Sequence, residues 1–250
     1  MSEKATPPGT RPEGTRGEQE AAAYVQAMFA RIAPRYDFLN HLLSFSRDKV
    51  WRRRTAQALS ARLADPKAHA LDLCCGTGDL TLELARAGAG KVVGGDFVHA
   101  MLVQAAEKAR ARHQPIELVE ADTLQLPFAD ETFEVVTAAF GFRNLAHYRR
   151  GLEEIYRVLK RGGEAGILEF SLPRNRVIGR VYGFYFRRVL PWIGAALSGV
   201  RGPYSYLPAS VERFPDCEEF ARWMGRAGFR SVRFERWTAG TVALHRGQRP

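Results

Sequence analysis

Residues 70–79 constrain the fold of this chain more than any other stretch. They read ALDLCCGTGD, an apolar run interrupted by Asp72 and followed by a turn that contains Gly76 and Gly78. Apolar periodicity resumes after Asp79, so the stretch predicts a buried strand, a glycine turn and a helix. Glycines let a backbone approach a ligand closely, and the free N–H groups of a helix start can bind its polar atoms. We therefore expect a ligand over this turn, in contact with Asp72, Gly76, Thr77 and Gly78.

The turn lacks one element of the dinucleotide-binding fingerprint. The pattern G-x-G-x-x-G requires a third glycine where Thr81 stands. The remaining pattern, acid-x-x-x-Gly-x-Gly, resembles the first motif of the class I S-adenosylmethionine methyltransferases. An NAD-dependent reductase is a weaker alternative, and by the motif alone a glycine turn in another α/β protein stays open.

Strands and helices alternate along the chain after this turn. Short apolar runs predict strands, and amphipathic segments between them, such as residues 147–161, predict helices. The strands are expected at residues 71–75, 91–97, 116–122, 132–140 and 165–170, with a hairpin at 229–237 and 240–246. This alternation is typical of a doubly wound parallel α/β sheet. A closing antiparallel hairpin is also how the seven-stranded, Rossmann-like sheet of class I methyltransferases ends.

Acids stand at the carboxyl ends of two of these strands. Asp96 lies 20 residues beyond Gly76, where doubly wound sheets place an acid that accepts the ribose hydroxyls. Asp122 and Thr123 follow the next strand and can reach the adenine edge, although an ordinary turn residue is an equal interpretation of Asp122. A carboxylate at position 96 suits any unphosphorylated adenosine ligand, so it does not separate NAD from S-adenosylmethionine.

Composition narrows the class of protein. With 250 residues, 46% of them hydrophobic, the chain suits one domain with additions. The three cysteines offer neither a disulfide framework nor metal-ligand spacing, so we expect a reducing, cytoplasmic location and no metal. No signal peptide or membrane span is evident. The net charge of +10 favours an anionic partner, either nucleic acid or a phospholipid surface, although a basic enzyme without either is equally compatible.

We divide the chain into three parts. Residues 1–20 predict a disordered tail, 21–64 an N-terminal helical lid beside the ligand site, and 65–250 the methyltransferase domain. Residues 171–213 interrupt the alternation with aromatic and basic side chains. Such a segment can lie in a membrane surface, and a core-packed insertion is the alternative. We expect charge reversal at Arg187 and Arg188 to weaken liposome binding if the membrane interpretation holds.

Two longer signatures resemble those of the C-methyltransferases of ubiquinone and menaquinone biosynthesis. The first, Tyr-Asp-x-Met-Asn followed by Ser, His and Trp, matches at Tyr36, Asp37, Asn40, Ser44 and Trp51. The second, Arg-Val-x-Lys-Pro-Gly-Gly and Glu-x-Ser, matches at Arg157, Val158, Lys160, Gly162, Gly163, Glu169 and Ser171. The sequence departs from them at Leu39, Asp48 and Arg161. The runs at residues 140–144 and 204–210 also resemble this family.

The resemblance implies an S-adenosylmethionine cofactor and a set of site residues. It implies that Thr77, Asp96, Asp122 and Thr123 contact the cofactor, with Ala139 contributing only its backbone. The remaining assignments are Arg143 as the catalytic residue that stabilises a phenolate, an unassigned proton acceptor with Asp37, His41 and Tyr206 as candidates, and substrate contacts by Tyr36, Asp37, Asn144, Tyr204 and Tyr206. A loop-anchoring salt bridge is the alternative role of Arg143.

The implied reaction is C-methylation of a prenylated hydroquinone, with demethylmenaquinol preferred. Alternatives are a 2-polyprenyl-6-methoxy-benzoquinol, an RNA or small-molecule methyltransferase, and a non-catalytic subunit of a quinone-synthesis complex. No Asn-Pro-Pro-Tyr or Asp-Pro-Pro-Tyr run follows the fourth strand, and no cysteine follows a proline, so we expect no nucleic-acid partner. We expect association with the inner face of the plasma membrane, and a homodimer is compatible with the sequence.

Overall fold

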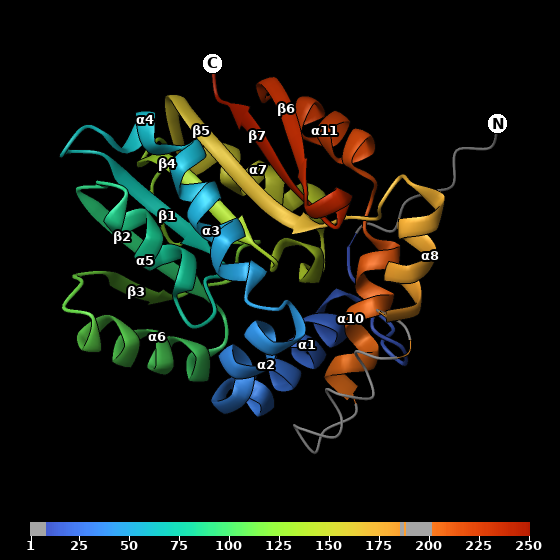
Figure 1. The fold of residues 1–250 in the computed structure, drawn as a ribbon. Coiled ribbons are helices and arrows are strands. Elements are labelled where there is room, and N and C mark those ends of the chain that lie inside the picture. The colour runs from blue at the N-terminus through green and yellow to red at the C-terminus, as the bar shows by residue number, and fades with distance from the viewer. Residues whose placement is uncertain (1–8, 186–187, 189–201) are drawn as a thin grey trace.

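The computed structural model of the chain describes residues 9–185, 188 and 202–250 (Figure 1). Within this part of the chain, seven strands form one sheet in the order β3-β2-β1-β4-β5-β7-β6. The strands are β1 (His69–Leu73), β2 (Lys91–Asp96), β3 (Glu117–Glu120), β4 (Phe133–Ala139), β5 (Leu159–Phe170), β6 (Arg230–Trp237) and β7 (Val242–Gln248). Strands β1 to β5 pair in parallel, and β7 pairs antiparallel with both β5 and β6. The predicted seven-stranded sheet with a closing antiparallel hairpin is confirmed.

Helices cover both faces of the sheet, and further helices lie beyond the carboxyl ends of its parallel strands. They are α1 (Glu18–Ile32), η1 (Ala33–Arg35), α2 (Tyr36–Leu43), α3 (Arg47–Ala58), α4 (Ser60–Leu63), α5 (Asp79–Arg86), α6 (His99–Ala111), η2 (Phe142–Asn144), α7 (Tyr148–Val158), α8 (Arg176–Phe184), α10 (Gly202–Arg213), α11 (Cys217–Arg226) and η4 (Thr238–Gly240). Figure 1 shows α3 and α5 in front of the sheet and α7 behind it. Helices α1, α2, α8 and α10 gather beyond the carboxyl ends of the parallel strands.

The two-residue period of the strands explains how one sheet serves two cores. Ala70 and Val135 are buried in a cluster with residues of α3, α4 and α5. Their chain neighbours Leu71 and Val136 are buried in the cluster on the other face, which includes α7 and α11. Successive strand side chains point to opposite faces, so near-continuous apolar strands are what a sheet covered on both sides requires.

The boundary between α7 and β5 differs from the prediction. We predicted a helix over residues 147–161 closed by two glycines, but α7 ends at Val158 and β5 begins at Leu159. Leu159 already pairs with Phe133 of β4, so the chain is committed to the sheet before the glycines. Gly162, with φ +76°, lies within the irregular start of the strand.

The predicted disordered tail also differs from residue 9 onward. Thr10 is buried and its backbone N–H donates to the Leu145 carbonyl at 2.7 Å. Arg11 donates to the Ala146 carbonyl at 2.9 Å, and α1 begins at Glu18. These backbone contacts compensate for the few apolar residues of this segment, which composition alone could not reveal.

Among the described residues, no helix has both the length and the apolar character needed to cross a bilayer.

Candidate active site

The glycine turn joins β1 to α5 through a run of left-handed backbone. Cys74, Gly76 and Gly78 have φ values of +51°, +55° and +80°. A Cβ on Gly78 would lie 3.1 Å from the Cβ of Ala105 on α6. The position therefore requires glycine both for its conformation and for the close approach of α6. Residues of the turn line two cavities, and a third cavity adjoins both of them at Tyr36.

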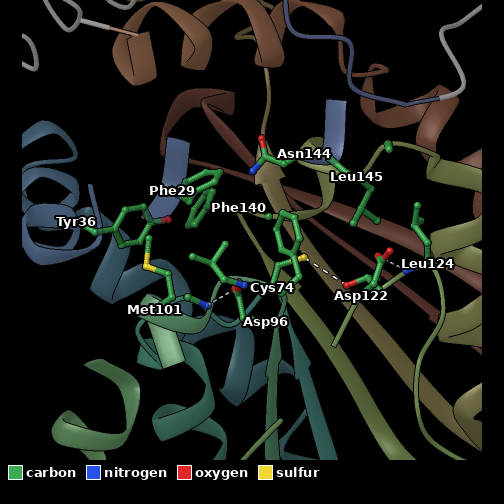
Figure 2. A pocket seen from close by; sticks show the side chains of 17 residues that line it. Phe29, Tyr36, Cys74, Asp96, Met101, Asp122, Leu124, Phe140, Asn144 and Leu145 are labelled. Carbon is green, nitrogen blue, oxygen red and sulfur yellow. Dashed lines mark hydrogen bonds between the residues drawn. The ribbon is translucent and has the colours of Figure 1, made fainter. Parts of the chain in front are cut away.

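Asp96, at the end of β2, ties the turn to the start of α6. Its two carboxylate oxygens accept the backbone N–H groups of Gly76 at 2.8 Å and Val98 at 2.9 Å. Burial raises the pKa of Asp96 to about 6, against the lowering effect of these hydrogen bonds. Each oxygen retains a lone pair for a further donor. In Figure 2 the carboxylate lies at the base of the cavity, below Cys74.

We name the space above Asp96 cavity A, with a volume of about 710 Å³. It is lined by residues that include Phe29, Asp96, Asp122, Thr123, Phe140 and Asn144. Asp122 and Leu124 lie on the opposite side of this cavity from Tyr36 and Phe29 (Figure 2). Asp122 also accepts the backbone N–H of Leu124 at 2.9 Å. It is therefore a turn residue, as the alternative interpretation of the sequence had it, and it also lines the cavity.

Cavity C, about 300 Å³ including space open to solvent, is also lined by the glycine turn, and its lining residues include Arg52, Asp72, Gly76, Thr77, Asp79 and Ala139. Asp72 is buried there and accepts hydrogen bonds from Thr81 at 2.7 Å and Thr137 at 2.8 Å. Burial raises the pKa of Asp72 to about 6, although both hydroxyl donors lower it. Ala139, predicted to offer only backbone, closes this cavity at the end of β4.

Thr77 connects the turn to the N-terminal helices. Its hydroxyl donates to Asp37 at 2.5 Å and accepts from Lys108 at 2.9 Å. Lys108 in turn contacts Asp37 at 2.6 Å and Asp79 at 2.7 Å. Asp37, predicted to contact substrate, is thus held in an ion pair with α6 and stabilises the position of α2.

Cavity B, about 1550 Å³, is the largest of the three and is lined mainly by apolar and aromatic side chains, among them Ile32, Leu39, Leu43, Phe140, Phe170 and Tyr182. It shares Phe29, Tyr36 and Phe140 with cavity A, and Tyr36 also lines cavity C. Burial raises the pKa of Tyr36. The three cavities therefore meet at one tyrosine of α2.

Arg143 lies at the wall of cavity B with a buried side chain. Its Nη1 pairs with Glu169 at 3.1 Å and its Nε donates to Ser210 at 3.3 Å. Nη2 makes no hydrogen bond within the described residues and is not enclosed, so it faces the cavity. Burial tends to lower the pKa of Arg143, but the negative charge of Glu169 raises it, and the net shift is upward. The salt bridge considered from the sequence is present, and one N–H group remains for a ligand.

The remaining residues that were predicted to contact substrate do not all line the same cavity. Tyr206 lines cavity B and donates to Asn144 at 3.0 Å, whereas Asn144 lines cavity A. The side chain of Tyr204 lies outside the described part of the structure, although its backbone belongs to α10. His41, a weak candidate for the proton acceptor, pairs with Asp48 at 2.8 Å.

One group of possible metal ligands occurs among the described residues. Single ligand atoms of His41, Asp48 and Asp79 lie within 4.8 Å of one another. Arg52 contacts the same two carboxylates, at 2.5 Å from Asp48 and 3.9 Å from Asp79. A guanidinium ion therefore compensates this negative charge, and the group is an ion-pair cluster.

Arg52 was not among the predicted site residues. Of the three consecutive arginines at positions 52–54, Arg52 alone is buried, and it lies beside cavities B and C. The helical period places Arg52 on one face of α3 with Asp48 and Thr55, but only the structure shows that this face is buried.

The sheet order and the cavities at the carboxyl ends of its strands define a class I methyltransferase fold. A methyltransferase structure from Thermotoga maritima, described as S-adenosylmethionine-dependent, superposes with a TM-score of 0.63 at 18% identity, over 90% of this chain and 99% of that one. The ubiE/COQ5 methyltransferase family matches residues 16–249, and the chain belongs to this family.

Two curated relatives are named demethylmenaquinone methyltransferase. The Thermus thermophilus protein is 51% identical over 89% of this chain and 100% of its own length. The Deinococcus radiodurans protein is 45% identical over 93% of this chain and 95% of its own length. The predicted family and enzyme class are confirmed.

Proposed function

We propose that this protein transfers a methyl group from S-adenosylmethionine to a ring carbon of demethylmenaquinol. The observation that carries the proposal is the junction at Tyr36, where cavity A, which contains the carboxylates of Asp96 and Asp122 beside the glycine turn, meets the larger apolar cavity B. A cofactor in the first and a prenylated ring in the second would come together at that junction. The names of the curated relatives support the same substrate.

The cavities beside the glycine turn fit the proposed cofactor. Asp96 has carboxylate lone pairs for ribose hydroxyls, and Asp122 and Thr123 line the same cavity A. Cavity C, with Asp72 and Thr77, has polar groups of the kind that an amino-acid tail requires. When bound, S-adenosylmethionine supplies a methyl group on a sulfonium, which the substrate carbon takes up while the electron pair of the broken bond stays on sulfur.

Arg143 would prepare the substrate. A phenol near the reacting carbon has a free pKa of about 10, so the protein must favour its ionised form. Nη2 of Arg143 faces cavity B, and a permanent cation there would stabilise a phenolate beside a mainly apolar lining. Methylation of the phenolate gives a neutral dienone, loss of the ring-carbon proton restores the aromatic phenolate, and protonation of its oxygen gives the hydroquinone. Tyr206 lines the same cavity, but burial raises its pKa and its hydroxyl donates to Asn144, so the proton acceptor stays unassigned.

We propose further that the protein works at an anionic membrane surface. Phe38, Leu42 and Phe45 form what we call the apolar stripe. Phe38 and Leu42 lie one turn apart on α2, Phe45 lies just beyond its end with φ +53°, and 60%, 43% and 77% of their surfaces are exposed. Phe45 lies 6.2 Å from the ring of Tyr185, beside which Phe184 is also exposed. The apolar stripe thus reaches the rim of cavity B, since both Phe45 and Tyr185 line that cavity.

Basic side chains accompany the apolar stripe. Arg47, Lys49 and Arg180 are exposed and form no ion pair within the described residues, so they can attract anionic lipid. Arg188 is exposed as well, whereas Arg187 lies outside the described residues. Aromatic side chains with flanking cations are typical of surfaces that insert shallowly into a bilayer.

Vesicle sedimentation tests the membrane proposal. The double substitution Phe38→Ser and Leu42→Ser should reduce binding to vesicles with anionic lipid, and high salt should weaken wild-type binding. Val103→Ser is the matched control, since Val103 is 45% exposed on α6. Unchanged vesicle binding by the double variant would refute the proposal that this surface binds membranes. Binding to a partner protein but not to vesicles would show that the surface docks a protein and would also refute the membrane proposal.

Transfer of radiolabelled methyl to organic-extractable product tests the reaction. Purified protein is given chemically reduced demethylmenaquinone or a reduced polyprenyl-methoxy-benzoquinone. Label in the naphthoquinol alone supports the proposal, and label in both adds the benzoquinol pathway. Label in neither, with cofactor still bound, would argue for a non-catalytic subunit or another methyl acceptor.

A further inference from the structure

Arg52 is a buried cation whose charge is only partly used by the protein. It follows Trp51 on α3, and only 7% of its surface is exposed. Nη1 binds Asp48 at 2.5 Å and lies 3.9 Å from Asp79. The guanidinium carbon lies 5.5 Å from the ring centre of Phe140. Two carboxylates and a ring face therefore hold the guanidinium in one orientation.

The other N–H groups of Arg52 are available to a ligand. Neither Nε nor Nη2 donates a hydrogen bond to any described residue. The enclosed side-chain atoms without partners in this part of the chain are on Gln114, Arg236 and His245. The free nitrogens of Arg52 are thus not enclosed, and they open on the cavities B and C that the residue lines.

Cavity C combines this cation with an acid. Asp72 lines it together with Arg52, and Lys108 neutralises Asp79 on the same rim at 2.7 Å. A small cavity with one carboxylate and one guanidinium matches an α-amino acid, whose ammonium and carboxylate have the opposite charges. Burial tends to lower the pKa of Arg52, but Asp79 and Asp48 raise it, and the net shift is upward, so the cation persists at any working pH.

We infer that Arg52 binds the α-carboxylate of the amino-acid tail of the cofactor in cavity C, which rests on the proposed function. A guanidinium can bind a carboxylate through two parallel hydrogen bonds, and both free nitrogens of Arg52 would serve. Arg52 is thereby a cofactor-binding residue contributed by α3, outside the glycine turn. It couples cofactor binding to the position of the N-terminal helices.

Calorimetry with two ligands tests this assignment without turnover. S-adenosylhomocysteine and its α-carboxamide differ only at the group that Arg52 would bind, which is a carboxylate in the first and a neutral amide in the second. Wild-type protein should bind the carboxylate form about tenfold or more tightly, the size expected of a charge-assisted pair. In Arg52→Gln this difference should disappear, while affinity for 5′-methylthioadenosine, which has no tail, stays unchanged.

Controls separate the possible failures. Arg53→Gln should behave like wild type, because the Arg53 side chain is 66% exposed on the same helix. No preference in wild type, or a preference that survives in Arg52→Gln, overturns the inference. If Arg52→Gln does not fold, Arg52→Lys is measured in its place. A preference of Arg52→Lys for the carboxylate ligand that equals the wild-type preference overturns the inference. A wild-type protein that binds none of the three ligands refutes the proposed function itself, and the inference with it.

Discussion

The buried carboxylate of Asp96 predicts a pH-dependent affinity for the nucleoside part of the cofactor. Ionised, it can accept both ribose hydroxyls while it holds the N–H groups of Gly76 and Val98. Protonation removes part of this acceptor capacity. Because burial places the pKa of Asp96 at about 6, binding should weaken as the pH falls below that value.

The size of the effect follows from the ionised fraction. With a pKa of about 6, about one carboxylate in eleven is ionised at pH 5, so the dissociation constant should rise about tenfold between pH 8 and pH 5. Asp96→Asn replaces two charge-assisted hydrogen bonds to the ribose with neutral ones. At about 1 kcal/mol for each bond, this should weaken binding at pH 8 by about 30-fold and flatten the pH profile.

Calorimetric titration with 5′-methylthioadenosine measures this prediction. The ligand lacks the amino-acid tail, which keeps the titration of Asp72, whose pKa is also about 6, from contributing. Glu120→Gln is the control, since Glu120 is the strand partner of Asp96 in the β2–β3 ladder and its side chain is 52% exposed. A flat wild-type profile, or the same slope in Asp96→Asn, would refute the proposed contact between Asp96 and the ribose.

Three further predictions concern catalysis, stability and the glycine turn. Arg143→Ala should lower kcat by about 100-fold while the dissociation constant of S-adenosylhomocysteine changes little, and equal losses of both would indicate a structural role. His245 is buried, which lowers its pKa to about 4 from 6.5, so its contribution to the free energy of unfolding is complete above pH 6.5 and is lost as the pH falls toward 4. Urea unfolding at pH 7.5 and 5.5 should therefore show a loss in wild type that is smaller in His245→Gln, and parallel losses would contradict it. Gly78→Ala should cost about 1 to 2 kcal/mol in urea unfolding because of its positive φ, whereas Gly225→Ala, in α11 with nothing within 4 Å of the added Cβ, should be neutral or stabilising.

Elements whose signal lies within a few adjacent residues were predicted well. The glycine turn, the acid at position 96 and the closing hairpin follow from local patterns, and each lies where it was expected. The end of α7 was predicted too late, because pairing of Leu159 with Phe133 competes with the helix and is a contact between distant segments. The packing of residues 9–17 was missed for the same reason, since its partners are more than 100 residues away.

The sequence by itself determined the class of fold, because strand and helix periodicity and the glycine turn are local properties of the chain. It also identified the family, through two signatures of fixed spacing. Only the tertiary structure decided which charged residues face the site. Arg52 and Arg53 are chemically identical neighbours, yet the packing of α3 against Asp79 and Phe140 buries the first and exposes the second. The physical reason is that burial and ion pairing depend on segments brought together by folding, and no single stretch of sequence contains them.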